Sequence, residues 1–218
     1  MTIAERCDTM GGRGGPGGLS NYTQFYDKDI ARNALGEGNG GEADTWVSNL
    51  SYDESSIVVK YTGSYYREFN KALRSAKGDE TQVSRQMLGE RSNLSSAISK
   101  YRLKHGTIFH RSSSASLLGG ASTVAEINKL VGSVVVDHGF TSATTTYSKG
   151  GGTMFGDIQY HISTPKGKGI GAWVRPISKH KSEEEFLFNY GSGFRVDGAY
   201  ESSSGVVHVN LTYLGRKQ

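Results

Sequence analysis

Hydrophobic residues recur three and four positions apart between residues 51 and 106, as they do on one face of an α-helix. Ser51, with Glu54 three positions later, is a possible capping box for the first helix. Gly78 ends the second hydrophobic pattern and Gly106 ends the third. The apolar positions of the predicted helices are Ile57, Val58 and Tyr61; Tyr65 or Tyr66, Phe69, Leu73 and Ala76; and Val83, Met87, Leu94, Ile98 and Tyr101. The first half of the chain is therefore predicted to be mainly helical.

The second half of the chain changes to a period of two, which is typical of β-strands with one buried face. A short strand is predicted before this change, at residues 107–110, and Thr123 with Glu126 is a possible cap for one more helix through Leu130. The alternating apolar residues are Ile158, Tyr160 and Ile162; Phe186, Phe188 and Tyr190; Phe194 and Val196; and Val207, Val209, Leu211 and Tyr213. Because helices come first and strands afterwards, we predict an α+β fold with helices packed on twisted antiparallel sheets.

Glycine divides the chain into two predicted parts. The sequence has 30 glycines among 218 residues, and they cluster at residues 11–18 and 36–41. Glycine-rich backbone loses much conformational entropy when it folds, so such stretches are typical of flexible linkers. We therefore predict a flexible arm over residues 1–42 and a single domain over residues 43–218.

Composition excludes several classes of protein. Lys and Arg number 25 and Asp and Glu number 21, and the resulting charge of +4 is scattered, which does not indicate specific nucleic-acid binding. No apolar run is long enough to span a membrane, and the N-terminus does not resemble a secretory signal. The single cysteine, Cys7, excludes an internal disulfide and a cysteine-built zinc site, and the six histidines lack metal-ligand spacing.

Three acidic residues, Glu183 to Glu185, run directly into an apolar strand pattern. If Glu185 opens the strand, Glu183 and Glu185 project to one face and Glu184 points away. Two neighbouring carboxylates repel each other and can raise one pKa, which suits a site that moves a proton or stabilises positive charge. A solvated acidic turn before the strand is the alternative interpretation.

Two further segments carry candidate chemistry. Arg111 ends a short strand and precedes the serines at 112–114, and its guanidinium matches phosphate oxygens, although it could be an ordinary surface arginine. Hydroxyl residues follow the apolar run 134–136 within residues 139–144, and these could hold a neighbouring carboxylate by hydrogen bonding. A strand with outward polar residues is the simpler interpretation of that second segment.

The order of Arg111, then a Phe-x-Ser turn at Ser142, then Glu-x-Glu at residues 183–185 resembles the R-S-E class of mono-ADP-ribosyltransferases. The resemblance covers roughly residues 44–216 and is closest to the catalytic domains of bacterial actin-modifying toxins and related phage-encoded enzymes. It is also carried by Trp46 and Leu50, by Tyr61-Thr62-Gly63, by Tyr66, Phe69-Asn70 and Leu73-Arg74, and by Phe194-Arg195-Val196. It implies the ADP-ribosyltransferase-like fold, with an N-terminal helical lobe packed on a twisted two-sheet antiparallel β core.

The resemblance implies roles for four residues in transferring ADP-ribose from NAD, the substrate, to arginine side chains of a target protein. Arg111 matches the family arginine that grips NAD phosphate and ribose, and Ser142 matches the first serine of the Ser-Thr-Ser motif. Glu185 matches the catalytic glutamate. Glu183 matches the first residue of Glu-x-Glu, which is glutamate in enzymes that modify arginine. No metal is implied.

Three aromatic residues are weaker matches to the family's NAD-binding residues, namely Phe155, Tyr61 and Tyr66. The sequence departs from the family pattern at Ala143, where the middle hydroxyl of Ser-Thr-Ser is missing. The loop at residues 176–182, which selects the protein substrate in the family, contains no aromatic residue, so the target cannot be copied from a relative.

The residues leave other functions open. An NAD glycohydrolase, a glycosidase that uses both carboxylates, and a non-enzymatic α+β binding module are the alternatives. Both a toxin domain and a phage or bacterial effector fit the resemblance. Either would act in the cytoplasm of a target or host cell, by a delivery route that the sequence does not reveal.

Overall fold

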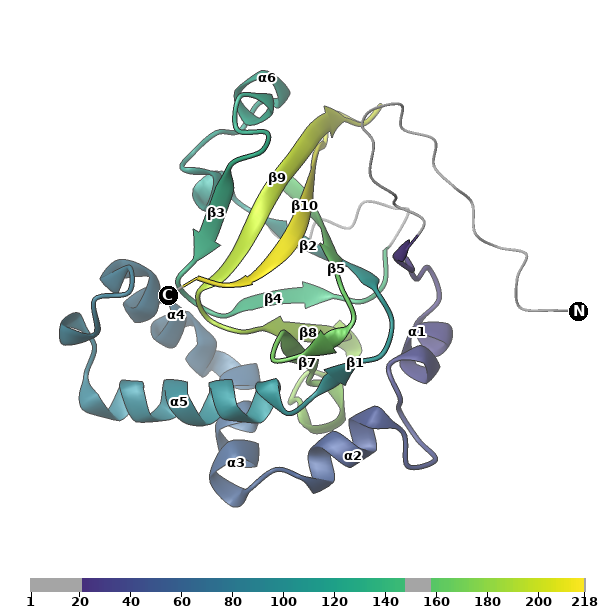
Figure 1. The fold of residues 1–218 in the computed structure, drawn as a ribbon, viewed down its shortest axis with the longest axis vertical. Helices are drawn as coiled ribbons and strands as arrows, with labels where there is room; N and C mark the ends of the chain where they lie inside the picture. Colours follow the sequence, from purple (N-terminus) through teal and green to yellow (C-terminus); the bar gives the residue numbers. More distant parts are fainter. Residues whose placement is uncertain (1–20, 148–157, 218) are drawn as a thin grey trace, which may run out of the picture.

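The computed structural model describes residues 21–147 and 158–217. Most of its helices lie around one end of a β core, and one short helix lies near the opposite end (Figure 1). The helices are α1 (Lys28–Ala34), α2 (Glu42–Ser48), α3 (Tyr52–Lys60), α4 (Tyr66–Ala76), α5 (Arg85–Ser99) and α6 (Val124–Asn128). The strands are β1 (Arg102–Leu103), β2 (Thr107–Ser113), β3 (Val134–Asp137), β4 (Thr141–Thr144), β5 (Ile158–Thr164), β6 (Gly167–Lys168), β7 (Gly171–Trp173), β8 (Glu185–Phe188), β9 (Ser192–Glu201) and β10 (Val207–Arg216). Within the described ranges, no helix has both the length and the apolarity of a membrane span.

Local capping signals place the helix boundaries. The Ser51 side chain accepts from the Glu54 amide and Glu54 accepts from the Ser51 amide, which confirms the predicted capping box of α3. Thr123 and Glu126 form the same arrangement at α6, but that helix ends at Asn128, before the predicted Leu130. The predicted helices at α4 and α5 are also present.

Eight strands form one hydrogen-bonded sheet in the order β3-β9-β10-β5-β2-β4-β8-β7, and β1 pairs separately with β6. The strand pairing differs in two details from the expected twisted two-sheet antiparallel core. β10 runs parallel to β5, with Val207 opposite Ile158, and the two halves of the sheet join where His110 of β2 pairs with Thr144 of β4. The period of two identifies the buried face of a strand but not the direction of its neighbour.

The helical lobe packs against the β4-β8-β7 side of the sheet (Figure 1). Phe109 of β2 stacks on Phe186 of β8 with ring centroids 4.0 Å apart, and both rings are fully buried. Trp46 of α2 is 1% exposed, and its indole donates a 2.8 Å hydrogen bond to the Ala97 carbonyl of α5. This apolar packing holds the helices at a fixed distance from the strands that carry the candidate residues.

The predicted flexible arm is wrong for residues 21–42, which are packed against the domain. Leu35 is 3% exposed, and its carbonyl accepts a 2.8 Å hydrogen bond from the Tyr101 hydroxyl. Thr23 forms a β-bridge with Thr107 of β2. Gly36 shows why glycine misled the prediction: its φ is +84°, and an added Cβ would lie 2.4 Å from the Glu42 amide nitrogen. Glycine is needed there for a tight turn rather than for flexibility.

Candidate active site

A cleft of about 670 Å³ opens between the α3–α4 junction and strands β2, β4 and β8. Its lining includes six of the residues proposed from the sequence, namely Tyr61, Tyr66, Arg111, Ser142, Glu183 and Glu185. Phe155 and Cys7 lie outside the described residues. Segments that are far apart in the sequence therefore bring Arg111, Glu183 and Glu185 to a single cleft of the size that binds a dinucleotide fragment or a drug-sized ligand.

Arg111 lies on β2 and reaches across to β4. Its Nη1 donates a 2.6 Å hydrogen bond to the Ser142 carbonyl oxygen, and its Nη2 lies 3.5 Å from Ser113 Oγ. Burial lowers the pKa of Arg111, although the nearby Asp137 carboxylate acts in the opposite direction. The guanidinium stays protonated at neutral pH because its ordinary pKa is far above 7. It supplies a fixed positive charge in the cleft.

Glu185 opens β8 and is 8% exposed. The pKa of its carboxyl is raised to about 7, mainly because the group is buried; the Ser142 hydrogen bond and the Arg111 charge act in the lowering direction, and the charge of Glu183 adds to the rise. Ser142 also hydrogen-bonds to Tyr61 through its side chain. The Ser142 hydroxyl thus links the buried carboxyl to the helical lobe.

The Glu-x-Glu segment reaches its geometry by a turn and not by strand alternation. Glu183 ends a 3₁₀ turn (Lys181–Glu183), and Glu184 has a left-handed backbone with φ 52° and ψ 42°. That conformation costs about 1–2 kcal/mol for a residue with a Cβ. The outcome is nevertheless the predicted one, because Glu183 and Glu185 both line the cleft and Glu184 does not. Glu184 and Glu185 are both buried, which does not fit the alternative of a solvated acidic turn.

Two residues of α4 hold the turn that precedes Ser142. Asn70 donates to the Phe140 carbonyl at 3.2 Å and accepts from the Phe140 amide at 2.8 Å. Arg74 binds Asp137 through two hydrogen bonds, from Nε at 2.7 Å and from Nη2 at 2.9 Å. Burial acts to raise the Asp137 pKa, but Arg74, together with hydrogen bonds from Thr141 and the Gly139 amide, outweighs burial, so the Asp137 pKa falls below its ordinary value. The sequence comparison noted Asn70 and Arg74 only as part of a pattern and did not assign them a function.

The two tyrosines of the helical lobe lie at a kink between α3 and α4. Gly63 leaves helical geometry there, with φ −85° and ψ −131°. Tyr61 is buried, which raises its pKa, and its hydroxyl accepts a 2.8 Å hydrogen bond from Asn70 Nδ2. Tyr66 is 39% exposed, with its ring 6.3 Å from that of Tyr61. The kink therefore presents one fixed and one accessible aromatic ring to the cleft.

Sequence reasoning missed a chain of three histidines, His110, His161 and His208. Nδ1 of His110 lies 2.9 Å from Nδ1 of His161, whose Nε2 lies 2.9 Å from Nδ1 of His208. His110 lines the cleft, and its buried Nε2 has no hydrogen-bond partner among the described residues. The three come from β2, β5 and β10, so only the strand pairing could have revealed the chain. The described residues contain no cluster of metal-ligating side chains.

Comparisons with known proteins show the family of the chain. The family model described as ADP-ribosyltransferase exoenzyme matches residues 39–214, and the chain belongs to this family. The chain is 30% identical over 164 residues to NAD(+)--arginine ADP-ribosyltransferase EFV of Enterococcus faecalis, a match that covers 72% of the chain and 31% of that protein. The chain thus spans less than a third of the length of this relative.

Solved structures share the fold at low sequence identity. Plx2a, an ADP-ribosyltransferase toxin from Paenibacillus larvae, superposes with a TM-score of 0.74 at 18% identity, over 88% of this chain and 98% of the toxin. C3stau2 from S. aureus, solved with NAD, gives a TM-score of 0.74 at 16% identity, over 90% of this chain and 100% of the other. These likenesses establish the predicted arrangement of a helical N-terminal part on a β core.

Proposed function

We propose that this chain transfers ADP-ribose from NAD to arginine side chains of a target protein and releases nicotinamide. The observation that carries the proposal is the convergence of Arg111, Glu183 and Glu185 on one cleft. Membership of the ADP-ribosyltransferase exoenzyme family and the activity named for the Enterococcus faecalis relative support it.

The cleft has the chemistry that NAD, as a substrate, requires. The Arg111 guanidinium would bind the phosphate oxygens, for which its planar donors are matched. Tyr61 and Tyr66 would contact the dinucleotide from the helical lobe, where one ring is fixed and the other accessible. Phe155 stays a prediction for the nicotinamide side. The cleft volume, about 670 Å³, is within the range of sites that bury most of a bound ligand.

The first chemical step breaks the bond between the nicotinamide nitrogen and C1′ of the ribose. The bonding electron pair leaves with neutral nicotinamide, and the ribose becomes an oxocarbenium ion. The Glu185 carboxylate, held by Ser142, would hydrogen-bond the ribose and stabilise the developing positive charge. Arg111 would hold the phosphates so that the ribose lies beside Glu185.

The second step forms a bond from a guanidinium nitrogen of the acceptor arginine to C1′. A protonated guanidinium is a poor nucleophile, so a base must orient it and take a proton. Glu183 is exposed at the cleft, where an arginine of another protein can reach it, whereas Glu185 is buried. We assign Glu183 this acceptor role.

Two isosteric variants test these assignments. With labelled NAD and the small guanidine agmatine as acceptor, Glu185→Gln should abolish both transfer and NAD hydrolysis. Glu183→Gln should abolish transfer and leave some hydrolysis, because the first step does not need the acceptor base. Wild-type activity in Glu185→Gln would refute the assignment, and hydrolysis without transfer by the wild-type protein would indicate an NAD glycohydrolase instead.

The partner in this proposal is a protein that bears the acceptor arginine, and the site of action is the cytoplasm of a target or host cell. The loop at residues 176–182 borders Glu183 and contributes His180 to the cleft lining, so it is placed to contact that protein. Incubation with labelled NAD and lysates of candidate target cells should label a protein band that is absent with Glu183→Gln. A band that persists with Glu183→Gln would contradict arginine as the acceptor.

A further inference from the structure

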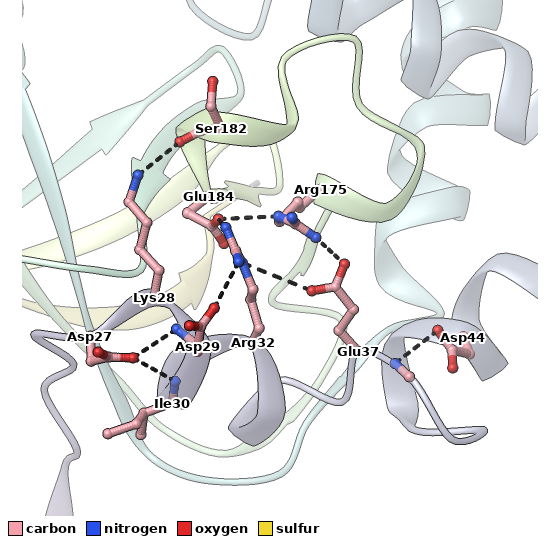
Figure 2. A network of polar contacts seen from close by, with 11 residues as sticks. Asp27, Lys28, Asp29, Ile30, Arg32, Glu37, Asp44, Arg175, Ser182 and Glu184 are labelled. Carbon is pink, nitrogen blue, oxygen red and sulfur yellow. Dashed lines mark hydrogen bonds and ion pairs between the residues drawn. The ribbon is translucent and has the colours of Figure 1, made fainter.

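Glu184, the residue between the two cleft carboxylates, is fully buried in an ion-pair cluster outside the cleft (Figure 2). Arg32 of α1 donates to Glu184 Oε1 from Nε at 3.0 Å and from Nη2 at 2.6 Å. Arg175 donates to the same oxygen from Nε at 3.1 Å. Two guanidinium groups from separate segments therefore converge on one carboxylate oxygen. We call Arg32, Glu37, Arg175 and Glu184 the Glu184 cluster.

The charges in the Glu184 cluster are compensated internally. Arg175 Nη1 also pairs with Glu37, whose other oxygen lies 4.0 Å from Arg32 Nε. Arg32 Nη1 donates a 2.8 Å hydrogen bond to Asp29. With each guanidinium shared between carboxylates, the cluster is built to join segments of this chain and not to bind an external anion.

The backbone on the two sides of Glu184 is held by different contacts. On the Glu185 side, the Glu184 carbonyl accepts from the Thr145 amide at 3.2 Å and the Glu185 carbonyl accepts from the Val174 amide at 3.0 Å. These bonds belong to the sheet region. On the other side, the Glu183 amide bonds only within its own loop, to the His180 carbonyl at 3.1 Å.

Helix α1 supplies contacts that hold this loop from outside it. Arg32 binds the Glu184 side chain, and Lys28 Nζ lies 3.4 Å from the Ser182 carbonyl oxygen (Figure 2). If the Arg32 contact is lost, Glu185 remains held by the sheet, whereas the turn that carries Glu183 loses both Arg32 hydrogen bonds to Glu184. It keeps the hydrogen bonds from Arg175 to Glu184 and from the Lys179 amide to Thr62. Loss of the Arg32 contact should therefore displace the Glu183 carboxylate more than the Glu185 carboxylate.

We infer that Arg32 is a positioning residue that presents Glu183 to the acceptor arginine by holding the left-handed turn at Glu184. This inference rests on the proposed arginine ADP-ribosyl transfer. Arg32 lies before residue 39, where the match to the family model begins, so the contact comes from a segment outside that match. The positioning acts on the second chemical step and leaves NAD binding and bond breaking to Arg111 and Glu185.

The test compares full-length Arg32→Gln and Arg32→Lys with the wild-type protein. Nicotinamide release without acceptor measures hydrolysis, and labelling of agmatine measures transfer, each with kcat and KM. In Arg32→Gln the ratio of transfer to hydrolysis should fall about tenfold while the KM for NAD is unchanged, because small misplacements of a catalytic group cost this much or more. Arg32→Lys should recover part of the ratio, since it keeps the charge but not the planar fork.

Arg85→Gln is the matched control, because Arg85 is exposed at the start of α5 and does not line the cleft. It should keep the wild-type ratio. An equal loss of transfer and hydrolysis in Arg32→Gln, or no loss of transfer, would overturn the inference.

Hydrogen exchange separates this inference from the proposed function. Amides of residues 180–184 should exchange faster in Arg32→Gln than in the wild-type protein, while those of β8 stay protected. If the amides of residues 180–184 exchanged at the wild-type rate in Arg32→Gln, the positioning role would be overturned, whatever the transferase activity of that variant. Faster exchange in a protein whose wild type neither hydrolyses NAD nor modifies agmatine would refute the proposed function and leave the mechanical role of Arg32 standing.

Discussion

The Arg111 guanidinium on β2 donates a 2.6 Å hydrogen bond to the backbone carbonyl oxygen of Ser142 on β4. The pairing of these two strands is otherwise limited to one register pair, His110 with Thr144. The same side chain therefore connects the two strands and supplies a positive charge at the cleft, which Arg67 and Arg74 also line. Its orientation is set before any ligand binds, which avoids the cost of ordering it on binding.

Replacing Arg111 by lysine tests this preorganisation. Lysine keeps the charge but lacks the planar fork, so it cannot bind Ser142 and a phosphate in the same geometry. We expect kcat/KM for NAD to fall about 100-fold and the stabilisation of the protein by NAD in thermal melts to be lost. Arg102→Lys, at an exposed residue of β1, should behave as the wild-type protein. Full NAD stabilisation of the Arg111 variant would contradict the assignment.

The Glu185 carboxyl should make the protein less stable as the pH rises. Its pKa in the folded protein is about 7, above the ordinary value of 4.5, so between these values the folded state binds more protons than the unfolded state. The free energy of unfolding then falls with increasing pH. Glu185→Gln should be more stable than the wild type by on the order of 2 kcal/mol at pH 8. In urea unfolding, the difference in unfolding free energy between Glu185→Gln and the wild type should disappear near pH 4.5. A difference that does not change with pH would refute the raised pKa of Glu185.

Asp137 should contribute to stability through its pair with Arg74. Asp137→Asn leaves Arg74 without its charged partner beside a buried turn, which we expect to cost about 2 kcal/mol, less than for a fully buried pair because the Arg74 side chain is 41% exposed. The matched control is Asp197→Asn, which breaks a more exposed pair with Arg195 and should cost less than about 1 kcal/mol. An equal loss of unfolding free energy in Asp137→Asn and Asp197→Asn would show that the Arg74–Asp137 pair contributes no more to stability than the exposed pair.

The histidine chain should limit stability in acid. Burial lowers the pKa of His161 to about 4 and that of His110 to about 3, so both are neutral in the folded protein when unfolded histidine is already protonated. The unfolded state binds more protons below pH 6.5, and stability falls as the pH drops from 6.5 toward 4. In His161→Gln, the loss of unfolding free energy between pH 6.5 and pH 4 should be smaller than in the wild type by on the order of 2 kcal/mol.

The control for this measurement is His105→Gln, because His105 is exposed in the loop before β2. Its unfolding free energy should follow the wild-type pH dependence. If His161→Gln also followed the wild-type curve, proton uptake by the histidine chain would not explain the acid sensitivity.

The sequence alone was sufficient wherever the cause of a structure lies within a few residues. The capping boxes at Ser51 and Thr123 appear where predicted, because each cap depends on a partner three positions away. The order of Arg111, Ser142, Glu183 and Glu185 was enough to nominate residues that the structure brings to one cleft.

Tertiary structure alone decided the features that depend on distant contacts. The parallel pairing of β5 with β10, the packing of residues 21–42, and the buried position of Glu184 between Arg32 and Arg175 each join segments far apart in the chain. Periodicity identifies which side of an element is apolar, but it does not identify which element covers that side. Local rules thus determined the elements and their chemistry, and packing between distant elements decided which groups face the cleft and which hold it in place.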